Sequence, residues 1–158
     1  MESMSLMIWI IDIIFIAGAA FNIYWQSQIT LKAKYKYTPI ILSVIVVTWI
    51  IGGSGYSLEY IIMIAAFLTT GIMNGVGGIG TKRIVNSGFF SNVYDYKKLA
   101  HITLIPLTLG TKERVVAIFN INARQSAQMI FNKDLFTIKT ELEKHVGDST
   151  EIEIGSLR

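Results

Sequence analysis

The sequence predicts a membrane α-helical protein, with three transmembrane helices followed by a small α+β cytoplasmic domain built from an antiparallel sheet and a C-terminal helix. Two observations support this fold class. The 158 residues are 52% hydrophobic and only 16% charged, which is too apolar for an ordinary soluble domain. Nearly all of the apolar excess lies before Gly80. We therefore expect a transmembrane region over residues 1–81, a cytoplasmic domain over 82–147 and a flexible tail over 148–158.

Three apolar runs make up the first half of the chain. They cover residues 6–25, 37–53 and 58–79, and each has about 17 to 22 residues, the length that crosses a hydrocarbon core of about 30 Å. Each run is predicted to be helical, because lipid offers no partner for a free backbone N–H or C=O group. The first run has neither a basic leader nor a small-residue cleavage site, which favours a retained helix over a signal peptide.

Basic residues are placed asymmetrically around these runs. They lie between the first and second runs and directly after the third: Lys32, Lys34, Lys36, Lys82 and Arg83. Because basic loops remain in the cytoplasm, we predict a multi-pass protein of the bacterial inner membrane, with its N-terminus outside and its C-terminal domain inside. The same five residues are candidate contacts for anionic lipid, which attracts basic side chains near the membrane surface.

The stretch GVGGIGTKR, residues 75–83, matches a phosphate-binding loop only in part. Gly75 and Gly80 have the spacing of G-x-x-x-x-G-K-[ST], but Thr81 and Lys82 stand in the reverse order, and the glycines lack the G-x-G-x-x-G phasing. The formal charge of +3 comes from dispersed lysines and gives no nucleic-acid footprint. We expect neither a nucleotide nor a nucleic acid as partner, and interpret GVGGIG as the cytoplasmic end of the third membrane helix.

Polar and small residues within the apolar runs are candidates for function. Asp12 lies inside the first run, and a carboxyl group in lipid is a candidate for ion or partner binding. The alternative is that Asp12 lies at head-group level, as Glu59 at the outer end of the third run suggests. Asn74 is a second intramembrane polar candidate, or a hydrogen-bonding group between helices. Gly71 and Gly75 form G-x-x-x-G, which either lets another helix approach closely or loosens the helix end.

From Arg83 onward, apolar and polar residues alternate with a period of two. The alternation of Val115, Ala117 and Phe119 with their neighbours predicts a half-buried strand. This strand and the run over residues 99–109 are predicted to form a hairpin around Gly110.

The period then becomes helical over residues 132–146. Leu135, Ile138 and Leu142 fall on one face, and Asn132 or Asp134 is a candidate N-cap. We expect about four antiparallel strands covered by this helix, an order that resembles small PH-like modules attached to bacterial membrane proteins.

The string GFFSNVYDY, residues 88–96, and the helical sequence DLFTIKTELEKH resemble the YobD family of small bacterial inner-membrane proteins. In that family three spans precede a short cytoplasmic domain, which opens with a glycine-aromatic-aromatic string, an Asn-Val pair and a tyrosine. The matching positions here are Gly88, Phe89, Phe90, Asn92, Val93 and Tyr96. The resemblance implies an accessory role at the membrane, because some members are encoded beside sugar-transporter genes, and it implies no catalytic residues.

No constellation of residues predicts catalysis. The chain has no cysteine, and His101 and His145 lie far apart in sequence without paired carboxylates around them. We therefore expect no enzyme activity, no cofactor and no metal site.

The function we predict is that of a non-enzymatic integral membrane accessory protein. Its cytoplasmic module would bind a membrane-protein partner or lipid, with Gly88, Phe89 and Phe90 as candidate contacts, and the resemblance links it to a sugar transport system. Self-association through Gly71 and Gly75 is a further expectation. The alternative is a small oligomeric transporter or a bacteriocin-immunity-type membrane protein that uses Asp12 in a polar path.

Overall fold

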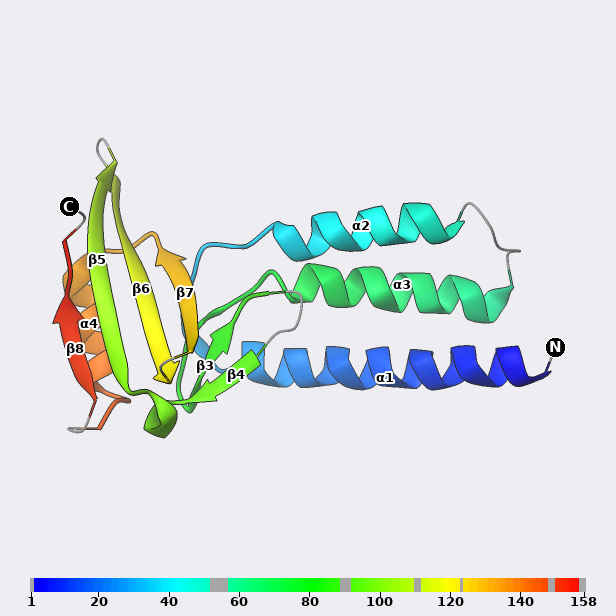
Figure 1. Cartoon of the computed structure of the whole chain (residues 1–158), viewed down its shortest axis with the longest axis horizontal. Helices are drawn as coiled ribbons and strands as arrows, with labels where there is room; N and C mark the ends of the chain where they lie inside the picture. Colours follow the sequence, from blue (N-terminus) through cyan, green and yellow to red (C-terminus); the bar gives the residue numbers. More distant parts are fainter. Residues whose placement is uncertain are drawn as a thin grey trace.

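The computed structural model describes residues 2–51, 57–88, 92–109, 112–122, 124–147 and 150–156. Three helices lie side by side, α1 (Glu2–Gln26), α2 (Thr38–Ile51) and α3 (Leu58–Met73), with α3 in the middle (Figure 1). The strands and α4 gather at one end of this row, and the N-terminus lies at the other (Figure 1). The chain runs in the same direction along α1 and α3 and in the opposite direction along α2 (Figure 1).

The prediction of three transmembrane helices followed by a domain is wrong. Over the described residues only α1 is long and apolar enough to cross a membrane, with 21 residues from Leu6 to Gln26 and a mean hydropathy of 2.2. α2 has 14 residues and α3 has 16. At 1.5 Å per residue they reach about 21 and 24 Å, which is short of a hydrocarbon core of about 30 Å. The chain is an α+β fold in which α2 and α3 are shorter apolar helices.

The third apolar run is shorter than predicted because its glycine-rich end is a strand. α3 ends at Met73, and β2 (Gly78–Gly80) follows. β2 pairs on both sides with antiparallel strands, so its backbone groups are bonded across a sheet. GVGGIG is therefore not the end of a membrane helix.

Two four-stranded sheets form the rest of the fold. The first has the order β1-β2-β3-β4, and the second has the order β7-β6-β5-β8. Besides β2, the strands are β1 (Ile29–Lys32), β3 (Arg83–Asn86), β4 (Asn92–Asp95), β5 (His101–Leu109), β6 (Lys112–Asn122), β7 (Gln125–Phe131) and β8 (Glu151–Ile154). A short 3-10 helix, η1 (Tyr96–Lys98), joins the two sheets along the chain. We call the two sheets, η1 and α4 the β module.

The predicted single antiparallel sheet with a C-terminal helix is wrong as well. β1 lies in the connection between α1 and α2. It pairs with β2, which follows α3 in the sequence. The helix α4 (Leu135–Glu143) is followed by β8, which pairs in parallel with β5. The second sheet therefore contains both parallel and antiparallel pairs.

One hydrophobic core unites the β module. Residues with no exposed surface come from both sheets and from α4: Ile79, Ile84, Ile102, Leu104, Ala117, Phe119, Phe131, Ile138 and Leu142. Two local predictions are confirmed. β5 and β6 pair as antiparallel strands, and Asp134 caps α4 by accepting a hydrogen bond from the Thr137 amide at 2.9 Å.

Candidate functional site

A groove lined by all three apolar helices is the most developed site on the described residues. Its part nearest the β module has a volume of about 300 Å³, and its part farther away has a volume of about 190 Å³. Phe15 and Phe67 line both parts, with their rings edge to face and the centroids 5.4 Å apart. We call the two parts the near compartment and the far compartment.

The two compartments differ in polarity. The near compartment has four polar lining residues, which come from α1, α2 and the end of α3: Asn22, Ser43, Thr70 and Asn74. Its other lining residues are apolar, aromatic or glycine. The far compartment is lined by apolar side chains alone, among them Ile11, Val47 and Met63. The groove is therefore partly polar near the β module and apolar farther from it.

The polar residues of the near compartment are held by hydrogen bonds. The Asn22 amide donates to Oδ1 of Asn74 at 2.9 Å, which joins α1 to the end of α3. The hydroxyl of Ser43 donates to the Pro39 carbonyl at 2.8 Å, and that of Thr70 donates to the Ala66 carbonyl at 2.9 Å. Because each hydroxyl proton is donated within its own helix, the two hydroxyl oxygens remain as acceptors.

The end of α3 is fixed by groups from three other segments. The side chain of Gln26 donates to the Met73 carbonyl at 2.7 Å, and the Tyr35 hydroxyl donates to the Ile72 carbonyl at 2.8 Å. The Gly88 amide donates to the Asn74 carbonyl at 2.9 Å. These bonds satisfy carbonyl groups that a helix end leaves without an intrahelical partner.

Both residues of the predicted G-x-x-x-G motif pack within the chain. A Cβ atom at Gly71 would lie 2.1 Å from Oγ of Ser43, and one at Gly75 would lie 2.3 Å from the ring of Tyr35. Gly71 therefore permits the close approach of α2 to α3, and Gly75 makes room for the tyrosine that caps α3. The motif serves contacts inside this chain.

Asp12 and Asn74, the two intramembrane polar candidates, lie apart. Asp12 is 1% exposed, and neither carboxylate oxygen has a hydrogen-bond partner among the described residues. Asn74 bonds to Asn22, which lies ten residues after Asp12, or about 15 Å farther along α1. The two candidates are not brought together into one polar path.

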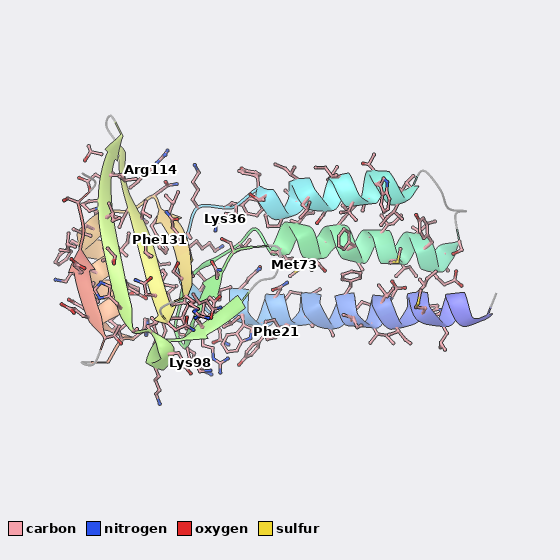
Figure 2. All side chains as sticks on the ribbon, viewed as in Figure 1. Phe21, Lys36, Met73, Lys98, Arg114 and Phe131 are labelled. Atoms are coloured by element: carbon pink, nitrogen blue, oxygen red, sulfur yellow. The ribbon has the colours of Figure 1, made fainter. Side chains whose placement is uncertain are left out.

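The predicted basic residues lie near the junction of the helices and the sheets. The Arg83 guanidinium lies over the Trp25 ring, 4.8 Å from its centroid, which links β3 to the end of α1. Lys36 lies between α2 and β7 (Figure 2), where its ammonium group donates to the Gln128 carbonyl at 3.3 Å. Lys32, Lys34 and Lys82 are exposed.

A polar cluster on α4 was not predicted from the sequence. Glu141 accepts hydrogen bonds from the Thr30 hydroxyl at 2.6 Å and from the Lys144 ammonium group at 2.9 Å. These bonds lower the pKa of Glu141 to about 2, and the bond from Thr30 has the largest effect. The cluster ties α4 to β1, and no local sequence pattern indicates it, since Thr30 and Glu141 lie 111 positions apart.

Of the predicted partner contacts, Gly88 is bonded to the end of α3, and Phe89 and Phe90 lie outside the described residues. Within the described ranges no group of three or more His, Cys, Asp or Glu side chains could hold a metal ion.

Comparisons of the chain with protein-family models, with curated proteins and with solved structures give no match. The resemblance to the YobD family therefore stays a prediction, and the function has to be argued from the geometry.

Proposed function

We propose that this chain is a non-enzymatic, membrane-embedded accessory protein that holds its β module at the membrane surface. In this proposal α1 crosses the membrane, and α2 and α3 lie beside it as a shorter hairpin within the same apolar layer. The module would bind a membrane-protein partner or lipid at that surface.

The observation that carries the proposal is the distribution of exposed apolar side chains. Large hydrophobic residues are exposed along all three helices, including Ile13, Ile16, Ile23, Ile41, Ile45, Trp49, Leu58 and Ile61. Beyond α3, Phe136 and Ile154 are the only exposed large hydrophobic residues in the described part of the chain. An apolar surface that covers three neighbouring helices is far larger than the patches of soluble monomers, and lipid is the solvent that such a surface fits.

The basic residues support one orientation of this arrangement. Lys32, Lys34 and Lys82 lie at the end of the helices that carries the β module, which favours the cytoplasmic side for the module and the outside for the N-terminus. The chain has no cysteine, so one introduced thiol reports on orientation. We expect an impermeant maleimide to label Gly55→Cys in intact cells, and to label Glu143→Cys only after lysis.

Membrane embedding is tested by the quenching of tryptophan fluorescence. Trp49 is 85% exposed on α2, and Trp9→Phe with Trp25→Phe leaves it as the single emitter. In vesicles of phosphatidylcholine with brominated acyl chains, we expect strong quenching of Trp49. Trp25, which lies beside Arg83 at the module end, serves as the matched single-tryptophan control and should be quenched less. Equal emission in brominated and plain vesicles for Trp49 would contradict the proposal.

A second candidate function rests on Asp12. A carboxyl group that is 1% exposed within an apolar helix, and that lacks a hydrogen-bond partner among the described residues, is the kind of group that transporters place on an ion path. The test is cation or proton flux in proteoliposomes. Flux that is lost in Asp12→Asn and kept in Asn74→Ala would favour a transporter, and absence of flux in the unmodified chain would exclude it.

A further inference from the structure

We propose that the groove over α3 binds one phospholipid of the surrounding membrane. An acyl chain would occupy the far compartment, and the polar head group would occupy the near compartment. This inference rests on the proposed membrane embedding, and it adds a ligand and a site to it.

The order of polarity along the groove fits a lipid of the leaflet beside the β module. In that leaflet the head group lies at the membrane surface and the acyl chain points toward the bilayer centre. The near compartment, with Asn22 and Asn74, lies at the end of the helices that carries the module, and Phe21 and Met73 mark this end in Figure 2. The far compartment is purely apolar and lies deeper.

The volume of the groove suits a single chain better than a helix. One turn of α-helix about 10 Å wide and 5.4 Å long fills roughly 400 Å³, which exceeds the volume of either compartment. An unbranched acyl chain is much narrower than a helix, and the two compartments adjoin at Phe15 and Phe67, which line both. Taken together, the compartments have the size of known small-ligand sites.

Gly18 is the second observation that points to a ligand. A glycine in the middle of a helix costs about 1 kcal/mol relative to alanine, so packing usually explains its presence. At Gly71 packing does so, but a Cβ atom at Gly18 would meet nothing within 4 Å. Gly18 lines the near compartment, and its missing side chain leaves space there.

The chemistry of the near compartment indicates which head groups fit. The hydroxyl oxygens of Ser43 and Thr70 are acceptors, which favours a lipid that donates hydrogen bonds. Lys34 is exposed and follows β1 at the same end of the helices, where a positive side chain favours an anionic head group. Phosphatidylglycerol supplies both the donor hydroxyls and the negative charge, whereas phosphatidylcholine has neither a donor hydroxyl nor a net negative charge.

The experiment uses the full chain in mild non-ionic detergent and native mass spectrometry with added phosphatidylglycerol. We expect the chain to bind one lipid with an affinity that exceeds that for phosphatidylcholine. Gly18→Leu fills the groove and should weaken binding by about tenfold or more. Gly147→Leu is the matched control, because a Cβ atom there also meets nothing within 4 Å, and Gly147 lies after α4, outside the groove.

Stability and insertion are measured on the same variants. Gly18→Leu should melt no lower than the unmodified chain, since leucine is a better helix former than glycine. Should it fail to fold, Ile64→Phe fills the far compartment from α3 and gives the same test. Embedding is followed separately by the quenching of Trp49.

Three results would overturn the inference. The first is equal lipid binding by Gly18→Leu and the unmodified chain. The second is the absence of bound lipid in a chain whose Trp49 is quenched. The third is a complex whose mass contains a second polypeptide in place of the lipid. Absence of Trp49 quenching in the chain with Trp9→Phe and Trp25→Phe would instead refute the proposed function, so the two failures are distinct.

Discussion

Gly78 offers the sharpest test of the junction between the helices and the β module. It lies on β2 opposite Lys32 of β1. A Cβ atom at Gly78 would lie 2.3 Å from the carbonyl oxygen of Leu31 and 3.1 Å from the Cα atom of Lys32. Both neighbours are backbone atoms of a paired strand, so they can move only if the β1–β2 ladder opens.

Gly78→Ala should therefore destabilise the chain. Overpacking of a tight site costs about 1–3 kcal/mol, and we expect the upper end of this range because no flexible side chain can give way. A loss of about 3 kcal/mol lowers the melting temperature of a chain of this length by roughly 10 °C. If residues 58–79 formed one membrane helix, the same change would stabilise it by about 1 kcal/mol. The sign of the effect separates the two structures.

The assay is a thermal melt of the full chain in detergent, followed by circular dichroism, with amide hydrogen exchange at Leu31 and Ile79. Exchange at these two amides should accelerate in Gly78→Ala, because they belong to the strands that are forced apart. Gly147→Ala is the control for a glycine with open space, and Gly18→Ala should raise the melting temperature. An unchanged or higher melting temperature for Gly78→Ala would refute the packing of β2 against β1.

Two further predictions concern polar contacts. Asn22→Ala and Asn74→Ala should couple by about 0.6 kcal/mol in a double-mutant cycle of melts in detergent, and zero coupling would contradict the bond between them. Hydrogen bonds, of which the bond from Thr30 has the largest effect, lower the pKa of Glu141 from 4.5 to about 2. The Glu141 carboxylate therefore contributes its full stabilisation of the fold above pH 4.5, and this contribution is lost as the pH falls through 2. The stability gap between the unmodified chain and Glu141→Gln should narrow over that window in melts at stepped pH. The control is Glu143→Gln, at an exposed ion pair, whose unfolding free energy should stay within about 0.5 kcal/mol of that of the unmodified chain. A stability difference between Glu141→Gln and the unmodified chain that does not change with pH would contradict the role of Glu141.

The sequence was informative where a pattern is long and local. α1 is a long and mainly apolar run, and α4 combines a helical stripe with the Asp134 cap. The strands β5 and β6 have 9 and 11 residues, enough for a period of two to be visible. Val115, Ala117 and Phe119 are buried as the alternation predicts, but Val116 on the opposite face is buried as well.

The elements that were missed are short, and they depend on distant partners. β2 has three residues and continues an apolar run, so no period distinguishes it from the end of a helix. β1 has four residues in a stretch whose lysines suggested a loop, and its partner lies about 50 positions away. β8 follows a helix and pairs in parallel with β5, and no local sequence pattern predicts this pairing. The near compartment of the groove was missed for the same reason, since Asn22 and Asn74 meet only after three helices have packed.

The glycine-rich stretch that was predicted to end a membrane helix instead joins α3 to β2. Only residues 74–77 separate α3 from β2, and residues 27–28 separate α1 from β1. Bonds from Gln26, Tyr35 and Gly88 hold the carbonyl end of α3 at the same place. These short connections and hydrogen bonds place the ends of α1 and α3 directly beside β1 and β2. The polar residues Asn22 and Asn74 of the near compartment lie at this same junction.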